Sequence, residues 1–260
     1  MVDIINNYYK EIISVYPNWI KNDIVITKID LGFSNKNYKL SYNSQSLFLR
    51  LYGKPISYKQ LEIDIKISKI FSAKILKTFE DGRIEEWING RPLRHSDINE
   101  SIISDIARNL AKYHNIIKLN HNDLSFVNIM LLDCPNLESN NQNLIKLIDF
   151  EFANKLDIHY DIANFFCEWM YTYENEDWYK YDLSKFPSME QIRIFCNVYL
   201  KNSTIIKNIP IDNFINQIFE KFDYVHNYWI EWALTQDNDV NHLYGLLRKE
   251  LIGYNFKQLL

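Results

Sequence analysis

The 260-residue sequence predicts an α+β fold in which a small antiparallel sheet precedes a larger, mostly helical region. Three short segments with strand-like composition, 23–30, 37–42 and 46–52, are separated only by turn-like stretches, which is typical of an antiparallel sheet. In residues 98–114, apolar residues instead recur at helical spacing. A chain of this length can bury a sizeable core, either as one large domain or as two small lobes.

Charge and cysteine content narrow the classes of partner. The formal net charge is −4 and no basic run of the nucleic-acid-binding type occurs, so no nucleic acid partner is expected. The three cysteines, at 134, 167 and 196, form no CxxC pair, which favours a reduced, cytoplasmic setting and argues against a zinc site. Asp3, Lys10 and Glu11 are unlike a secretory signal, and no apolar stretch is long enough for stable membrane insertion.

The first elements can be justified in chain order. Apolar residues at 4, 5, 8, 9, 12 and 13 have helical spacing, so an amphipathic helix is expected over residues 2–16. In the strand 46–52 the leucines at 47, 49 and 51 alternate with Arg50, which therefore points away from the leucine face. Residues 61–71 are ambiguous, because apolar residues at every second position indicate a strand, while their length and lack of turn residues permit a helix. Residues 73–78 and 83–87 form two further strand candidates around a turn.

The later elements frame a polar segment. Residues 98–114 place Ile102, Ile106, Leu110 and Tyr113 on one face, which predicts a buried helix ending at His114, a residue expected to have a packing role. Residues 128–132 and 144–148 read as two strands joined by an irregular loop. A hairpin brings its outer ends together, so the side chains at 128 and 149 are expected to converge although 21 positions separate them.

Two short motifs carry the chemistry. Residues 121–128 read H-N-D-L-S-F-V-N, and residues 149–151 read D-F-E. A carboxylate that accepts a hydroxyl proton, together with an Asn and an Asp that hold Mg²⁺, is the arrangement of kinase-type phosphoryl transfer. The continuation through Asp161 to Glu168-Trp169 resembles the choline/ethanolamine kinase family, whereas the H-R-D, D-F-G and A-P-E motifs of protein kinases are missing. The resemblance runs from about 24 to 254 and is specific in 121–169 and 228–232.

The resemblance implies a two-lobed, protein-kinase-like fold. Residues 1–88 would form the nucleotide-binding lobe and residues 89–260 the catalytic and acceptor-binding lobe, with Gly90 and Pro92 marking the passage between them. It also implies an ATP- and Mg²⁺-dependent kinase that phosphorylates the hydroxyl of choline or ethanolamine, the entry step to phospholipid head-group synthesis. Family members often form dimers through the small lobe, so a homodimer is a further partner that the resemblance suggests.

The resemblance assigns roles in the catalytic core. Asp123 would accept the proton of the substrate hydroxyl, and Asn128 and Asp149 would bind Mg²⁺. Glu151 would reach a second metal ion or its water. Asp161 resembles the buried carboxylate that braces the catalytic loop, and the histidine that opens this loop, His121, would also be structural.

A second group of residues is assigned to the nucleotide. The turn at 32–35 would lie over the ATP phosphates, where backbone N–H groups cradle phosphate oxygens. Arg50 corresponds to the phosphate-binding arginine of these kinases. Read as a helix, residues 61–71 would supply its partner carboxylate, Glu62, with Asp64 as the alternative. The full set around the nucleotide is Gly32, Phe33, Ser34, Asn35, Arg50 and Glu62, with Glu86 and Ile88 bracketing the adenine.

The acceptor pocket is expected to be aromatic. Trp229 and Trp232 lie three positions apart in an apolar helical segment and share a face. A quaternary ammonium cannot donate hydrogen bonds, so aromatic faces and nearby carboxylates recognise it. The resemblance adds Glu168, Tyr173 and Tyr254 to this pocket. Leu251 and Ile252 stand where the family has acidic and aromatic side chains, a departure that bears on acceptor preference and leaves the reaction type unaffected.

Two alternatives stay open. An aminoglycoside-type or other small-molecule phosphotransferase would share HxDxxxxN and the D-F metal motif, but would lack the Glu151–Asp161–Glu168 continuation and the paired tryptophans. A non-catalytic, kinase-like binding protein is the second alternative, favoured by the glycine-poor turn at 32–35. The presence of Asp123, Asn128 and Asp149 together argues against it.

Overall fold

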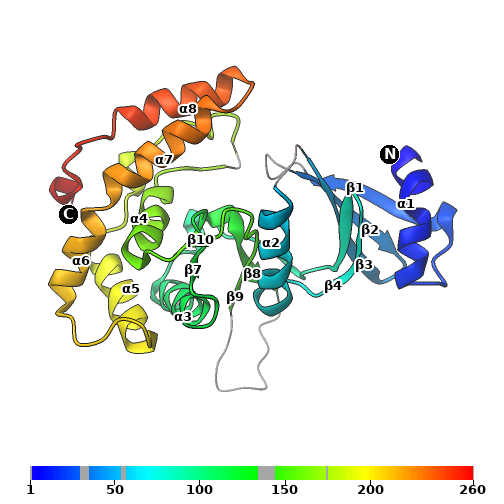
Figure 1. The fold of residues 1–260 in the computed structure, drawn as a ribbon, viewed down its shortest axis with the longest axis horizontal. Helices are drawn as coiled ribbons and strands as arrows, with labels where there is room; N and C mark the ends of the chain where they lie inside the picture. The colour runs from blue at the N-terminus through cyan, green and yellow to red at the C-terminus, as the bar shows by residue number, and fades with distance from the viewer. Residues whose placement is uncertain (1, 30–34, 54–56, 134–143, 174, 260) are drawn as a thin grey trace. The chain divides into compact units, whose positions relative to one another are not determined.

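A computed structural model describes residues 2–29, 35–53, 57–133, 144–173 and 175–259 (Figure 1). The chain divides into two compact units, Met1–Gly90 with Ile148–Glu151, and Arg91–Leu147 with Phe152–Leu260. The change of unit at Gly90 lies two residues beyond the end of the expected first lobe. The sequence also gave no signal that four residues near position 150 return to the first unit.

The first unit is built on an antiparallel sheet of five strands in the order β1-β2-β3-β5-β4. The leucines at 47, 49 and 51 lie in its core together with Ile12 of the leading helix and Trp19. The predicted alternation along the third strand is therefore confirmed. The elements are α1 (Val2–Val15), the 3₁₀ turn η1 (Lys21–Asp23), β1 (Val25–Ile29), β2 (Asn35–Tyr42), β3 (Gln45–Tyr52), α2 (Tyr58–Phe71), β4 (Ile75–Phe79) and β5 (Gly82–Glu86).

The ambiguous segment 61–71 belongs to a helix, α2. Ser57 caps its first turn, since the Ser57 hydroxyl accepts a hydrogen bond from the backbone N–H of Gln60. Asp64, Ile67 and Ser68 are the buried residues of α2. Their spacing of three and four positions is that of one helix face. The alternating isoleucines thus do not mark a strand, and the buried face carries a carboxylate instead.

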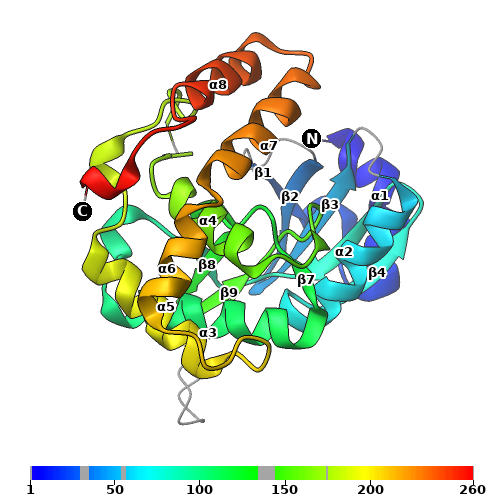
Figure 2. The same ribbon diagram turned by 60° about the vertical axis from the view of Figure 1, so that its left-hand side comes forward.

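The second unit is mainly helical. Figures 1 and 2 both show α7 and α8 side by side. Its helices are α3 (Glu100–Ile117), α4 (Ile158–Glu168), α5 (Met189–Asn202), α6 (Ile211–Phe219), α7 (Phe222–Leu234) and α8 (Asp239–Lys249), with 3₁₀ turns η2 (His95–Asp97), η3 (Phe126–Asn128), η4 (Leu183–Lys185) and η5 (Phe256–Leu259). Its strands are β6 (Gly90–Pro92), β8 (Ile129–Leu132) and β9 (Ile145–Leu147) in one sheet, and β7 (Leu119–Asn120) and β10 (Asn154–Lys155) in another.

Two predicted elements of this unit are confirmed. In α3 the residues Ile102, Ile106, Leu110 and Tyr113 are all buried, and Asn99 caps the first turn. The strands β8 and β9 pair antiparallel with Ile129 opposite Leu147. Asn128 directly precedes the first of these paired residues, and residue 149 follows two positions after the second. In the part of the chain that the structure describes, no helix is both long and apolar enough to cross a membrane.

Candidate active site

The loop that carries Asp123 is held by a single buried carboxylate. Asp161, in the first turn of α4, accepts the backbone N–H of His121 at 2.7 Å and that of Asn122 at 2.7 Å. Asn122 takes a left-handed backbone (φ 64°) and donates its side-chain amide to the carbonyl of Phe152 at 2.9 Å. These bonds fix the two residues before Asp123, and with them the direction of the chain at that residue.

His114 extends this brace to two further helices. It is fully buried at the end of α3, with Nε2 2.8 Å from Asp161 Oδ2 and Nδ1 2.7 Å from the hydroxyl of Tyr199 in α5. Burial acts to raise the pKa of Asp161, but the hydrogen bond and charge of His114, together with the interactions of His121, outweigh it and the pKa of the carboxyl is lowered. The packing role expected for His114 is therefore also a hydrogen-bonding one. His121 is buried too, with its ring 6.1 Å from that of Tyr113.

Asp123 and Asn128 lie together in the second unit. The Asn128 side-chain amide donates to the backbone carbonyl of Asp123 at 2.8 Å and to its carboxylate Oδ2 at 2.8 Å. With the amide nitrogen committed to Asp123, the amide oxygen is the atom of Asn128 that can ligate a cation. Tyr228 of α7 is near enough to respond electrostatically, because burial and then the charge of Asp123 raise the pKa of Tyr228 to about 12.

The first unit holds the other two expected metal ligands. Asp149 has a left-handed backbone (φ 65°), and its Oδ1 accepts from Arg50 Nη1 at 3.2 Å. Glu151 Oε2 accepts from the side-chain amide of Asn35 at 3.2 Å. Between them, the Phe150 N–H donates to Asp64 Oδ1 at 3.2 Å. The D-F-E motif is thus anchored within the first unit at each of its three residues.

The expected pairing of Arg50 with Glu62 is wrong. Glu62 lies on the exposed face of α2, where its carboxylate is 3.8 Å from Lys66. Arg50 is only 5% exposed and pairs instead with Asp149, while its Nε lies 3.8 Å from Glu85 Oε1. Burial acts to lower the pKa of Arg50, but Asp149, Glu85 and Asp64 together outweigh it and the pKa is raised. The physical reason is the helical phase of α2, which turns Glu62 outwards.

The alternative carboxylate, Asp64, has a different partner that sequence reasoning missed. Arg83 of β5 is buried, donating Nη1 to Asp64 and Nε to Glu85 Oε1 at 2.6 Å. Burial acts to lower the pKa of Arg83, and the two carboxylates together raise it. A signal was present: Arg83 and Glu85 alternate with Ile84 and so share a sheet face, and Arg83 pairs in register with Arg50.

The remaining nucleotide residues can be placed only in part. Gly32, Phe33 and Ser34 lie outside the described residues. Glu86 is exposed at the end of β5, and its backbone N–H already donates to the carbonyl of Lys74 at 2.9 Å. Ile88 is half-buried two residues later. The backbone N–H of Glu86 is therefore already used in a hydrogen bond within the first unit.

The paired tryptophans of α7 have different exposures. Trp229 is 5% exposed, and its indole N–H donates to Asn164 Oδ1 at 2.8 Å. Trp232 is half-buried, with its ring edge-to-face to Trp229 at 5.6 Å. Glu168 is buried, and its Oε2 accepts from the Tyr173 hydroxyl at 2.5 Å. Two of the three residues that the resemblance added thus meet each other in this unit.

Tyr254 is placed elsewhere. It packs edge-to-face on Phe256 at 4.9 Å and lines a cavity of about 570 Å³ with residues of α6 and the start of α7. Neither tryptophan of α7 lines that cavity. Tyr254 lies just before η5, and this segment lies beside α6 and does not cover the tryptophans of α7. The expected role for Tyr254 in the acceptor pocket therefore has no support in this geometry.

A buried cation that sequence reasoning missed completes the aromatic cluster. Arg248 of α8 is fully buried and donates Nη2 to Glu168 Oε1. Its guanidinium lies 4.5 Å from the ring of Tyr171 and 4.7 Å from that of Tyr244. The available signal was the spacing of Tyr244 and Arg248, four positions apart on one helix face.

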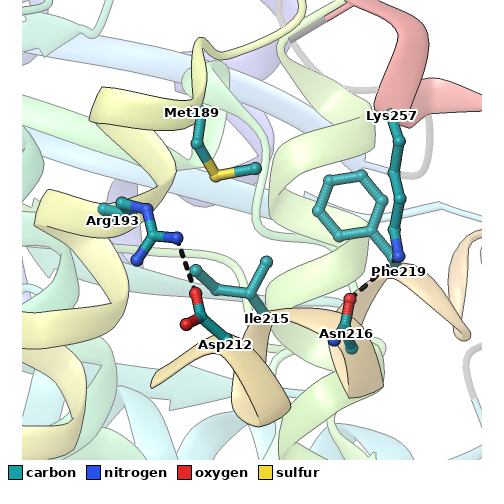
Figure 3. Close-up of a pocket in the computed structure, with 7 residues that line it drawn as sticks. All are labelled: Met189, Arg193, Asp212, Ile215, Asn216, Phe219 and Lys257. Carbon is teal, nitrogen blue, oxygen red and sulfur yellow. Dashed lines mark hydrogen bonds and ion pairs between the residues drawn. The ribbon is translucent and has the colours of Figure 1, made fainter. Parts of the chain in front are cut away.

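A second, smaller cavity of about 260 Å³ lies beside α5 and α6 (Figure 3). Its polar side chains are hydrogen-bonded to one another: Arg193 donates to Asp212 at 2.5 Å and Lys257 donates to the amide oxygen of Asn216 at 2.8 Å. It contains none of the residues predicted from the sequence. Among the described residues, no group of three or more His, Cys, Asp or Glu is arranged to hold a metal ion.

Comparisons with known proteins agree with these observations. A sequence model described as choline/ethanolamine kinase matches residues 26–119 and 115–248. A choline/ethanolamine kinase of Homo sapiens is 24% identical over 266 residues, which cover 74% of this chain and 66% of the human protein. The chain spans 56 to 66% of the length of the first curated relatives that it matches.

Solved structures show the same fold. A choline kinase from Cryptosporidium parvum Iowa II superposes with a TM-score of 0.78 at 20% identity, covering 100% of this chain and 98% of that one. An ethanolamine kinase from Plasmodium vivax gives a TM-score of 0.70 at 21% identity, covering 92% and 84% respectively. These likenesses confirm the predicted α+β, protein-kinase-like fold.

Proposed function

Because the chain belongs to the choline/ethanolamine kinase family, we propose that it transfers the γ-phosphate of ATP to the hydroxyl of choline or ethanolamine. The observation that carries the proposal is the braced loop, in which Asp161 fixes the chain before Asp123 and Asn128 holds the Asp123 carboxylate. A fixed carboxylate is what a general base for a hydroxyl group requires. The products would be phosphocholine or phosphoethanolamine.

Magnesium is the metal that this reaction implies, and the donor atoms fit it. Mg²⁺ prefers oxygen ligands, and the candidates are the amide oxygen of Asn128 and the carboxylates of Asp149 and Glu151. The amide nitrogen of Asn128 is already committed to Asp123, which leaves its oxygen for a cation. When bound, Mg²⁺ would supply positive charge that offsets the negative charge developing during transfer.

Arg50 supports the nucleotide side of the proposal. Its Nε is buried and has no hydrogen-bond partner within the described part of the chain. An unused guanidinium N–H in a buried site favours an anion, and a phosphate oxygen of ATP supplies one. Asp149 holds the same guanidinium through Nη1, so the phosphate-binding group is oriented before the nucleotide arrives.

Residues of the chain would then share the work of the transfer. Asp123 would accept the proton of the attacking hydroxyl, and Asn128 would keep the carboxylate aimed at it. In transfers of this kind most of the reduction of the activation barrier comes from positioning, on the order of 7–11 kcal/mol from orientation as a whole.

We also infer a cytoplasmic setting, which the two buried free thiols of Cys167 and Cys196 support.

Release of ADP from Mg·ATP tests the proposal with choline, ethanolamine and kanamycin as parallel acceptors. We expect turnover with at least one of the two amino alcohols and none with kanamycin. Turnover with kanamycin alone would favour the aminoglycoside-type alternative. No turnover with any acceptor, together with no shift of the melting temperature on adding nucleotide, would favour a non-catalytic binding protein.

A further inference from the structure

Two buried arginines and three carboxylates of the first unit form one continuous charge network. Arg83 lies between Asp64 and Glu85, donating Nη1 to the first and Nε to Oε1 of the second at 2.6 Å. The same Glu85 Oε1 is 3.8 Å from Nε of Arg50, whose Nη1 donates to Asp149 Oδ1 at 3.2 Å. All of these residues except Asp149 are at most 5% exposed, so water screens their charges little.

The network returns to the D-F-E motif through the backbone of that motif. Asp64 accepts from Arg83 with Oδ2, and its Oδ1 accepts from the N–H of Phe150 at 3.2 Å. Ser68, one helical turn further along α2, donates its hydroxyl to the same Oδ1 at 3.2 Å. One carboxylate of α2 therefore holds the backbone of the motif, while a guanidinium of β3 holds the side chain of Asp149.

The charges of this network do not cancel. Asp64 accepts hydrogen bonds from a guanidinium, a hydroxyl and a backbone N–H, which together favour its ionised form. Three carboxylates then face two guanidiniums, which leaves one net negative charge in a poorly hydrated region. Asp149 is the most exposed member of the network, with 19% of its side chain exposed. A divalent cation beside Asp149 would therefore meet an excess of negative charge while keeping part of its water shell.

We propose that Asp64 is a positioning residue that sets the affinity of the proposed Mg²⁺ site, through the backbone of Phe150 and through the excess charge of the network. The inference rests on the proposed function, and it gives α2 a role that its expected pairing with Arg50 did not contain. A residue that holds a metal ligand without touching the metal typically changes the metal affinity by about 10- to 100-fold when it is replaced. Arg83 keeps Asp64 buried and charged, so the loss of Arg83 acts first on stability.

Binding of ADP with and without Mg²⁺ tests Asp64 by a readout other than turnover. Isothermal titration calorimetry of the full chain gives the factor by which Mg²⁺ tightens the binding of ADP. In Asp64→Asn the side chain keeps its size and loses its charge, so we expect this factor to be about 10-fold smaller than in the wild-type protein. The ADP affinity without Mg²⁺ should change by less than about 2-fold, because Arg50 remains available to the phosphates.

Two control variants separate positioning from surface charge and from stability. Glu62→Gln makes the same change of carboxylate to amide on the exposed face of α2, and it should leave the Mg²⁺ factor unchanged. Ile12→Val lowers stability in the core of the same unit outside the network, and it should also leave the factor unchanged. An equal Mg²⁺ factor in folded Asp64→Asn and in Glu62→Gln would overturn the inference while leaving the proposed function intact. Absence of ADP binding by the wild-type protein would instead contradict the proposed function.

Amide hydrogen exchange of the wild-type protein tests the same contact without any variant. The N–H of Phe150, followed by NMR, should exchange slowly, because Phe150 is fully buried and a buried carboxylate accepts its hydrogen bond. Exchange at the rate of an unstructured peptide would overturn the inference, and this measurement decides it even if Asp64→Asn does not fold.

Discussion

Asp123 illustrates how a single residue depends on neighbours distant in sequence. Asn128 holds its carboxylate, and Asp161 holds the two residues before it. The variant Asp123→Asn keeps the shape of the side chain and removes the proposed base, so we expect kcat to fall by about 10²- to 10⁴-fold. The binding of ATP, measured by thermal shift, should be unchanged. Asp133→Asn, at an exposed position after β8, is the control and should keep full activity.

Arg83 is expected to contribute to the stability of the fold more than to the reaction. It lies 1% exposed between two carboxylates, Asp64 and Glu85. In Arg83→Leu both carboxylates stay buried without their cation, so the free energy of unfolding should fall by about 3–5 kcal/mol. Lys66→Ala removes the exposed pair with Glu62 and should cost at most about 0.5 kcal/mol. Urea unfolding of both variants measures the difference, and equal losses would contradict it.

At this scale the sequence predicts which residues are polar and special, but not always which of them meet. Asp123 and Asn128 are hydrogen-bonded to each other, and so are Glu168 and Tyr173. The sequence assigned each pair to one site but did not predict these hydrogen bonds. Neither carboxylate of α2 pairs with Arg50, because the helical phase turns Glu62 to solvent and Asp64 pairs with Arg83. The partner of Arg50 is Asp149, 99 positions away in the sequence, which local patterns cannot indicate.

The helices α3, α4 and α5 meet at one hydrogen-bonded chain, Tyr199–His114–Asp161. In His114→Ala the Asp161 carboxylate loses a donor, and the loop before Asp123 loses part of its support. We expect kcat to fall by about 10²-fold with both KM values within about 2-fold, because misplacement affects the transition state more than binding. His114→Gln keeps an N–H for Asp161 and should recover part of kcat. Equal melting temperatures with unequal kcat would separate positioning from folding.

The same brace predicts a stability change in acid. Burial acts to raise the pKa of Asp161, the interactions with His114 and His121 together outweigh it, and the net pKa lies below the ordinary 3.8. Between the lowered value and 3.8 the unfolded chain holds this proton and the folded chain does not. The contribution of Asp161 is therefore complete above about pH 4 and is lost as the pH falls through its folded pKa. Urea unfolding from pH 3 to pH 6 should show this slope, and Asp161→Asn should flatten it.

Elements proved more predictable than pairings. The hairpin β8–β9 and the helix α3 follow from turn residues and periodicity, which are local properties of the sequence. Helix α2 was harder, because Leu61, Ile63 and Ile65 are only partly buried and their alternation is unrelated to the core. The spacing of Tyr244 and Arg248 places them on one helix face but does not indicate that Arg248 is buried, since its partners Glu168 and Tyr171 lie about 80 residues away.

The whole chain passes from the first unit to the second at Gly90 and returns for Ile148–Glu151. Phe150 is fully buried, and its N–H is bound by Asp64 of the first unit. A fragment of residues 91–260 should therefore expose Phe150 and aggregate or melt without cooperativity. Co-expression with residues 1–90 should restore a soluble, cooperatively folded protein. Cooperative unfolding of 91–260 alone, seen by calorimetry, would contradict this dependence.

The order of sheet and helices was predictable at this scale, because composition changes along the chain. The return of four residues was not, since the D-F-E motif shows where the strand ends but not to which unit Ile148–Glu151 belongs. The segment is held in the first unit by hydrogen bonds with the side chains of Arg50, Asn35 and Asp64, all more than 80 positions away in the sequence.

The left-handed backbone of Lys118, the C-terminal cap residue of α3, indicates a substitution that could increase the stability of the protein. Lys118 has φ 61°, a conformation in which glycine is unstrained, so Lys118→Gly should gain up to about 1 kcal/mol in the free energy of unfolding. Asn122 and Asp149 share that conformation, but their side chains hold the segments proposed to be catalytic through hydrogen bonds. Glycine at either position is therefore expected to raise stability and lower kcat. Of these three positions with a left-handed backbone, only Lys118 is therefore suited to a stabilising change to glycine.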